Sequence, residues 1–403
     1  MRVKFLTYAL AILAGTAVLA APARALTCNH SQSFGAWLQD FKREAVGMGI
    51  SQRTVNSALQ GVTYAPDIVR KDRAQGVFSQ TFIKFSGRMV AAYRLKKGRS
   101  LIRKHRSIFA RVEKKYGVPA PVIVGFWGLE TDFGANNGKS PILRSLATLA
   151  YDCRRPEMFR EQLIAALKIV ERGDLRPSEL VGAWAGEIGQ TQFLPAHYYE
   201  FGVDFNRDGK VDLRHSVPDV LASTARLLVY HGWRRGEPWL QEVVVPRKMP
   251  WQEADISIQH PRSDWVKWGV KLRSGKQLPA DNLPASLILP MGRNGPAFLG
   301  YNNFRVYTEW NQSLIYALTA AYYATRLDGA PAYNHGRGPL PAFSAGQVKE
   351  LQRLLTKHGY DVGEIDGKLG VKSRAAVRKA QIKLGLPADS YPSKALFAKL
   401  RGR

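Results

Sequence analysis

Cysteine is scarce in this chain, because its 403 residues include only Cys28 and Cys153. Two cysteines alone make a weak metal site, and neither an HExxH nor a GxSxG pattern is present, so the sequence gives no sign of a zinc protease or a serine hydrolase. In an oxidising compartment a pair of cysteines is more often a disulfide than two free thiols. If the chain is exported, we therefore expect a Cys28–Cys153 bridge.

Acidic residues are also few, since 32 Asp or Glu stand against 59 Lys or Arg and leave a formal net charge of +27. Such an excess predicts an anionic partner, which could be nucleic acid, anionic lipid or an acidic polymer such as a cell wall. The basic residues are spread along the chain and no motif of a nucleic-acid-binding module is present, so nucleic acid is not expected. Low-complexity tracts are lacking too, and 45% hydrophobic residues indicate a globular protein of two or more domains.

The mature chain lacks an apolar run long enough to span a membrane. Residues 1–25 have a positive start, an apolar run over residues 5–20 and a small-x-small sequence at residues 23–25, which together predict a secretory signal peptide. The apolar run is short for a membrane anchor. Thr27, before Cys28, is not the small residue that lipoprotein signals usually have there. We expect an exported, periplasmic protein without a lipid anchor.

The stretch Pro119–Gly134 is apolar on nearly every face and predicts a buried helix, with proline at its start and glycine at its end. Within it, the carboxylate of Glu130 shares a helix face with Ile123, Phe126 and Trp127. Burial among such groups raises a carboxyl pKa, and a Glu that stays protonated near neutral pH can act as a general acid. The alternative is a partly solvated Glu130 at the helix end, without a catalytic role.

The segment Gly182–Pro195 combines three glycines and two glutamines with aromatic residues. Amides hydrogen-bond to sugars and aromatic rings stack on them, so Trp184, Gln190 and Gln192 are candidate substrate-binding residues. The other interpretation, supported about equally, is a tight helix–helix packing site made by the small residues.

Oxygen-bearing side chains recur over residues 204–215 with the spacing of an EF-hand calcium loop. Loop positions 1, 3, 5 and 9 are held by Asp204, Asn206, Asp208 and Asp212. Position 12 should be a bidentate Glu and is His215, although Asp219 could replace it or could instead cap the helix that follows. The pattern predicts a structural Ca²⁺ site, and no cofactor is expected for the chemistry.

Helical periodicity dominates the rest of the chain, with apolar residues at helical spacing in segments 34–45, 78–95, 101–116, 158–171, 220–231 and 307–326. Short apolar segments at 243–245, 287–289, 297–299 and 304–306 predict strands of a small inserted sheet. Residues 329–342 contain six Gly or Pro and are expected to form a linker. Beyond the linker, three helices are expected in residues 343–403, which carry 13 Lys or Arg against 5 Asp or Glu.

Four motifs follow one another along the chain: Phe126–Gly134, Trp184–Phe193, Val203–Gly209 and Trp310–Ser313. In this order they resemble the lytic murein transglycosylase B family over residues 28–327. The resemblance implies a mainly α, lysozyme-like catalytic domain with a small inserted β-sheet, here residues 26–328. It assigns the family's catalytic Glu to Glu130, its cation loop to Asp204, Asn206 and Asp208, and its substrate-contacting helix to Asn311 and Tyr316. Trp310 replaces a Tyr of the family pattern.

The C-terminal residues carry a second resemblance. Its motifs are Tyr360–Gly363, Asp366–Gly367, Gly370, Ala376–Val377 and Gln381. Over residues 345–401 they resemble a peptidoglycan-binding domain of the three-helix type, which we assign to residues 343–403. Ala380 stands where that family usually has Phe.

Together the resemblances imply a lytic transglycosylase, expected to be monomeric, whose partner is the peptidoglycan glycan strand. Such an enzyme cleaves the β-1,4 bond between N-acetylmuramic acid and N-acetylglucosamine, uses one Glu as acid and then base, and leaves a 1,6-anhydro end. Two alternatives stay open. A hydrolytic muramidase would need a second carboxylate, for which Glu187 is the candidate, and a non-catalytic scaffold would bind the wall without cutting it.

Overall fold

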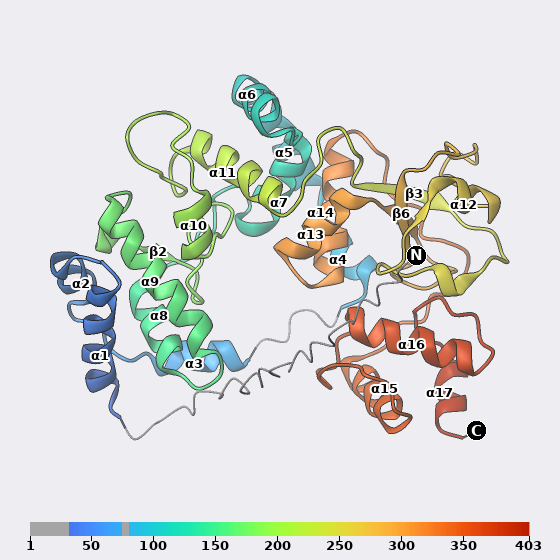
Figure 1. The fold of residues 1–403 in the computed structure, drawn as a ribbon. Coiled ribbons are helices and arrows are strands. Elements are labelled where there is room, and N and C mark those ends of the chain that lie inside the picture. The colour runs from blue at the N-terminus through green and yellow to red at the C-terminus, as the bar shows by residue number, and fades with distance from the viewer. Residues whose placement is uncertain (1–31, 75–79, 403) are drawn as a thin grey trace, which may run out of the picture.

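The computed structural model describes residues 32–74 and 80–402, and within them the chain is mainly helical. The sheet has five strands and the C-terminal domain has three helices. Figure 1 shows them beside a helical body in the centre and a helical lobe at the N-terminal side. The fold class predicted from the sequence is therefore confirmed. The predicted signal peptide and Cys28 lie outside the described residues. Within those residues, no helix is both long and apolar enough to cross a membrane.

The N-terminal lobe packs the first three helices of the chain against a later pair of helices around one apolar core. Its helices are α1 (Phe34–Gly47), α2 (Gln52–Leu59), α3 (Pro66–Arg73), α8 (Ile142–Tyr151) and α9 (Pro156–Arg172). Ser33 and Ser51 accept hydrogen bonds from backbone N–H groups of the first turns of α1 and α2, so both helices begin at a serine cap. Two strands of two residues each, β1 (Ser140–Pro141) and β2 (Val181–Gly182), pair antiparallel before α8 and after α9.

The central body is built around α7 (Ala120–Thr131), in which every side chain except those of Pro121 and Glu130 is buried. Its core is shared with α4 (Phe82–Met89), α5 (Ala92–Lys104), α6 (Arg106–Tyr116), α11 (Val217–Tyr230), α13 (Asn302–Trp310) and α14 (Leu314–Leu327). α10 (Pro195–Phe201) packs against α9 and α11. Gly128 permits the close approach of α14, because a Cβ at this position would lie 2.9 Å from the ring of Phe133 and 3.0 Å from that of Tyr323. The buried helix predicted from the sequence is thus the centre of the main core.

The sheet is antiparallel, with the strand order β4-β6-β7-β3-β5. Its strands are β3 (Leu240–Val244), β4 (His260–Pro261), β5 (Lys271–Leu272), β6 (Pro284–Ile288) and β7 (Ala297–Gly300), and α12 (Arg262–Lys267) follows β4. Two short 3-10 helices, Pro177–Glu179 and Trp251–Glu253, are the remaining elements before the C-terminal domain.

One predicted strand is wrong, because residues 304–306 belong to α13. Their apolar-polar-apolar order fits a strand over three positions. Over the whole helix, however, the buried residues are Asn303, Phe304, Val306 and Tyr307, which is helical spacing. The predicted helix over 307–326 is also broken. α13 ends at Trp310, and α14 begins at Leu314 after the cap residue Ser313, whose hydroxyl accepts the backbone N–H of Tyr316.

The C-terminal domain consists of α15 (Ala345–Lys357), α16 (Val371–Lys383) and α17 (Lys394–Leu400) around a small apolar core. Ala380 is fully buried in this core, where a larger residue was expected. Phe397 belongs to the same core and stacks on Phe343 at 5.4 Å between ring centroids. Aromatic side chains at other positions therefore contribute to the volume of the core around Ala380. Figure 1 shows the domain beside the sheet, below β6 and α12.

Candidate active site

Glu130 is the only charged side chain of α7 and lies in its last turn. Its Oε1 accepts two hydrogen bonds, one from the indole Nε1–H of Trp310 at 2.8 Å and one from the hydroxyl of Tyr316. Trp310 ends α13 and Tyr316 lies in the first turn of α14, so the break between these helices places both donors at the acid. Within the described residues Oε2 accepts no hydrogen bond, which leaves it free to carry the proton.

Glu130 is half-buried, with apolar side chains around its carboxyl group. This desolvation is the largest influence on the group and raises the pKa of Glu130 to about 7. The hydrogen bonds from Tyr316 and Trp310 favour the carboxylate and lower the pKa, whereas the negative charge of Glu187 raises it. Both protonation states are therefore populated at neutral pH. A carboxyl group with this pKa can donate a proton in one step and accept one in the next.

Aromatic rings fix the position of the Trp310 indole. Its ring lies 4.3 Å from that of Phe126 on α7 and 5.7 Å from that of Phe193, measured between centroids. Phe126 also stacks on Tyr307 at 4.9 Å. The donor at Glu130 is thus held by rings from two other segments. The sequence marked Trp310 only as a departure from a family pattern, and nothing local indicated its bond to a residue 180 positions away.

Glu187, the candidate second carboxylate, lies close enough to Glu130 for its charge to act on the pKa of that group. Burial raises the pKa of Glu187 itself, while the charge of Arg155 lowers it. The Oε2 atom of Glu187 is buried, and no hydrogen-bond partner for it lies in the described part of the chain. The fold therefore brings together two carboxyl groups that are 57 positions apart in sequence.

Gln190 holds parts of the protein to one another. Its Oε1 accepts the indole N–H of Trp127 at 2.8 Å, its Nε2 donates to the carbonyl of Arg214 at 2.8 Å, and its own carbonyl accepts the hydroxyl of Thr131 at 2.6 Å. Gln190 is also 7% exposed. These contacts support the packing interpretation of this segment, and a contact of Gln190 with substrate stays a prediction.

The other predicted substrate residues are more accessible. Gln192 is half-buried and donates from Nε2 to the carbonyl of Gly189 at 2.9 Å, which leaves its Oε1 without a partner among the described residues. Trp184 packs with one side against the N-terminal core and is only partly buried. Asn311 accepts the backbone N–H of Ser313 at 2.9 Å, and no partner for its Nδ2 lies in the described ranges. Asn311 lies next to Trp310, whereas Tyr316 contacts Glu130 directly.

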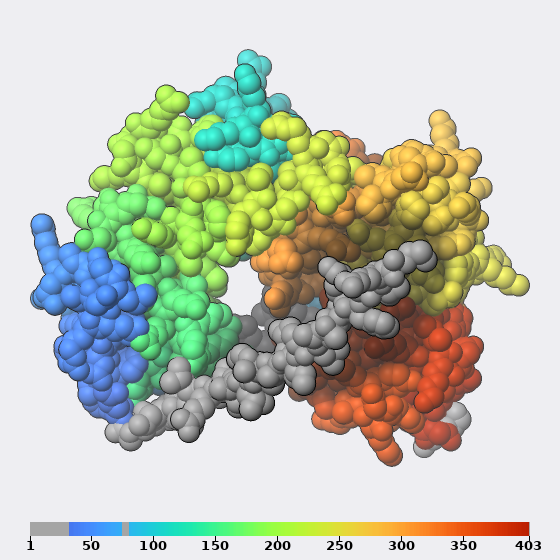
Figure 2. Space-filling model, in the orientation of Figure 1, coloured from blue at the N-terminus to red at the C-terminus, as the bar shows by residue number. Residues whose placement is uncertain are grey.

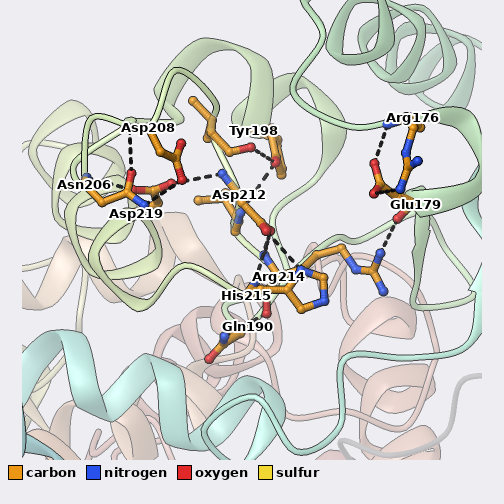
Figure 3. Close-up of polar contacts among 12 residues, drawn as sticks. Arg176, Glu179, Gln190, Tyr198, Asn206, Asp208, Asp212, Arg214, His215 and Asp219 are labelled. Carbon is orange, nitrogen blue, oxygen red and sulfur yellow. Dashed lines mark hydrogen bonds and ion pairs between the residues drawn. The ribbon is translucent and has the colours of Figure 1, made fainter.

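The predicted cation loop is shown in Figure 3. Asp204 accepts the backbone N–H groups of Asp208 and Gly209, at 3.1 and 2.9 Å, and the side chain of Asn206 donates to Asp208 at 2.8 Å. The side chains at positions 1, 3 and 5 of the loop therefore lie close together. Asp219 is fully buried, and its carboxylate accepts the backbone N–H groups of Phe205, Asn206 and Asp212.

The chemistry of this loop fits a hard cation at three of its positions. Asp212 lies within 3.0 Å of the Nδ1 atom of His215, so position 9 is bonded to the residue at position 12. The carboxylate of Asp219 holds the loop backbone through three N–H groups. In the described residues, no cluster of three or more His, Cys, Asp or Glu side chains is arranged to hold a metal ion. We therefore expect any cation here to bind weakly and to act on structure.

The predicted disulfide cannot be placed, because Cys28 lies outside the described residues. Its pairing with Cys153 stays a prediction.

Residues 33–325 match the family described as the transglycosylase SLT domain, and residues 344–400 match a peptidoglycan binding domain family. A curated relative, the membrane-bound lytic murein transglycosylase B of Escherichia coli (strain K12), is 32% identical over 210 residues. That match covers 52% of this chain and 56% of the relative, so it spans little more than half the relative's length.

Two solved structures are similar in fold. SltB3 from Pseudomonas aeruginosa, in complex with NAG-anhNAM-pentapeptide, has a TM-score of 0.85 and 39% identity, covering 92% of this chain and 100% of that one. The Escherichia coli lytic transglycosylase Slt35, in complex with calcium, has a TM-score of 0.63 and 26% identity, covering 72% of this chain and 92% of that one.

Proposed function

The chain belongs to the transglycosylase SLT domain family and carries a peptidoglycan binding domain, and from this premise we propose that it is a lytic transglycosylase of peptidoglycan. The substrate bond would be the β-1,4 bond between N-acetylmuramic acid and N-acetylglucosamine. The observation that carries the proposal is a single carboxyl group on a buried helix, with a pKa of about 7 and two donors on one of its oxygens.

In the proposed first step, Glu130 gives its proton to the glycosidic oxygen, the bond to C1 of the muramic acid breaks, and N-acetylglucosamine leaves. The resulting Glu130 carboxylate is stabilised by Trp310 and Tyr316. In the second step the carboxylate takes the proton of the C6 hydroxyl of the same muramic acid, and O6 bonds to C1. The product ends in 1,6-anhydro-N-acetylmuramic acid, no water is consumed, and Glu130 is protonated again.

One observation, on Glu187, favours an alternative function, that of a hydrolytic muramidase. Glu187 has a buried oxygen without a partner in the described residues, beside Glu130. Two carboxyl groups are what a glycoside hydrolase uses to activate water or to form and resolve a glycosyl-enzyme. We favour transglycosylation because the family pattern contains one catalytic Glu. On this proposal Glu187 acts by raising the pKa of the acid.

Digestion of purified peptidoglycan in oxygen-18 water tests the choice. We expect fragments that are one water lighter than reducing-end sugars and that contain no label. Labelled reducing ends that disappear in a Glu187→Gln variant would establish the hydrolase. A protein that binds the wall but releases no fragments would instead be the non-catalytic scaffold.

The remaining parts of the proposal follow the domains. We assign residues 26–328 to catalysis, 329–342 to a connecting segment and 343–403 to wall binding. We also propose an exported, periplasmic monomer without a lipid anchor. The Escherichia coli relative is named as membrane-bound, so fractionation of cells that express the full chain, with and without detergent, is the test. A Slt35 complex with calcium supports a cation at the loop of Asp204, and no step of the reaction uses that cation.

A further inference from the structure

Helices α5 and α6 follow each other directly, joined at His105, and carry a large excess of positive charge. These residues, 92–116, are called here the basic helix pair. They include ten Lys or Arg and one Glu, a net of +9, which is a third of the formal charge of the whole chain. The reaction proposed above uses none of these charges. Figure 1 places the pair at the top edge of the molecule, and in Figure 2 its cyan surface projects beyond the neighbouring helices.

The outer face of α5 carries cations and neutral groups and no acid. Helical spacing brings six exposed residues to this one face: Tyr93, Lys96, Lys97, Ser100, Arg103 and Lys104. At the edge of the face, Arg94 is ion-paired with Asp132 at 3.3 Å. In the described part of the chain, no carboxylate forms an ion pair with any of the four cations of the face itself. The face is therefore a row of uncompensated positive charge.

α6 extends the charged surface with four more exposed cations: Arg106, Arg111, Lys114 and Lys115. The last three line a pocket of about 470 Å³ together with Arg207, from the loop before α11. Asp204 also lines the pocket, but its carboxylate already accepts the backbone N–H groups of Asp208 and Gly209. Four cations around a pocket of this size suit an anionic group such as a phosphate.

The shape of this surface indicates a flat partner. Small-molecule sites are usually concave, whereas these cations lie on the outer side of helices that project from the molecule (Figure 2). Tyr93 shares the face with the cations of α5 and is 55% exposed. An exposed Tyr among Lys and Arg is typical of surfaces in the headgroup region of a membrane, because the ring is amphipathic and the cations meet lipid phosphates.

We propose that the basic helix pair docks the protein on a membrane surface that contains anionic phospholipids. The C-terminal domain, which matches a peptidoglycan binding domain family, lies at the lower right of Figure 1, away from α5 and α6. The protein can therefore contact membrane and wall at the same time. Such docking is electrostatic and needs no lipid anchor, so salt releases the protein, whereas an anchored protein requires detergent.

The test measures co-sedimentation of residues 26–403 with vesicles of phosphatidylglycerol and phosphatidylcholine, and with vesicles of phosphatidylcholine alone. The variant combines Lys96→Gln, Arg103→Gln and Lys104→Gln, which removes three exposed charges from α5 and keeps good helix formers there. A matched control lowers the net charge equally at exposed positions in the loops after β3 and β5, by Arg247→Gln, Lys248→Gln and Lys276→Gln.

Wild type should bind the vesicles that contain phosphatidylglycerol and should not bind phosphatidylcholine alone. Raising the ionic strength from about 0.1 M to about 1 M should release it, because the Debye length falls from about 10 Å to about 3 Å. The α5 variant should lose about a hundredfold in vesicle affinity, as for three cations at an anionic surface, and the control should bind nearly as wild type does. Equal losses in variant and control, or binding that does not depend on phosphatidylglycerol, would overturn the proposal.

Lipid-free peptidoglycan sacculi distinguish the membrane from the wall as the partner of this surface. The α5 variant and its control should both bind and digest the sacculi as wild type does, because the substituted residues lie outside the candidate active site. If the α5 variant loses affinity for sacculi as strongly as for vesicles, the basic helix pair binds the wall and the membrane proposal is refuted.

Discussion

Replacing Trp310 by Phe should move the pH profile of the enzyme upward. The substitution keeps an aromatic ring between Phe126 and Phe193 but removes the indole N–H that donates to Glu130. That hydrogen bond favours the carboxylate and lowers the pKa of Glu130, so its loss raises the pKa above about 7. The first step needs the protonated form, and the alkaline limb of kcat/KM reports its loss. That limb should therefore move to higher pH.

The size of the shift follows from the contacts. A hydrogen bond to a charged group contributes roughly 1.5–3 kcal/mol, and one pKa unit corresponds to about 1.4 kcal/mol. Tyr316 still donates to the same oxygen in the variant and compensates in part. We therefore expect a rise of roughly one unit in the pKa of Glu130. The measurement is kcat/KM on a peptide-free glycan oligomer between pH 5 and 9.

Tyr307→Phe provides the matched control. Tyr307 belongs to the same helix and aromatic cluster, and its hydroxyl is buried without a hydrogen-bond partner in the described residues. Its removal should leave the alkaline limb in place. If Trp310→Phe lowers activity at every pH without moving the limb, or if both variants move it equally, Trp310 does not set the pKa of the acid.

Three further outcomes are expected. Glu130→Gln should fold and bind the wall but lose at least about 10³-fold in kcat; near-wild-type turnover would remove Glu130 from catalysis. The same variant should be more stable than wild type, and its advantage in the free energy of unfolding should be larger at pH 8 than at pH 4 by roughly 2 kcal/mol. The reason is that the folded state raises the pKa of Glu130 from 4.5 to about 7, so the wild-type protein loses stability as the pH rises between these values. A gain independent of pH in thermal melts would contradict the raised pKa. Calcium should raise the melting temperature and chelator lower it by mass action, and an Asp204→Ala, Asp208→Ala double variant should abolish the difference; identical wild-type melts would show that the loop binds no calcium.

The features that could be predicted from the amino-acid sequence are those whose signals are local. An apolar run with one carboxylate predicted the buried helix and singled out Glu130 as the candidate acid, because burial of a helix shows in the periodicity of its own residues. The spacing of oxygen side chains likewise located the loop of Asp204, and the breakers at residues 329–342 separated the last three helices. Residues 304–306 of α13 were wrongly predicted as a strand, since an apolar-polar-apolar order over three residues fits a strand and a helix equally.

Tertiary structure alone decided how these parts meet. Trp310 and Glu130 are 180 positions apart, and their bond depends on how α13 and α14 pack against α7. The approach of Glu187 to Glu130 and the docking of Arg374 on the end of β6 likewise depend on long-range packing. The bonds of Gln190 to Trp127 and Arg214 show the same limit, because nothing in the sequence near Gln190 indicated these partners. Which partner a polar group finds depends on what the fold places within about 3 Å of it, and no local pattern encodes that neighbour.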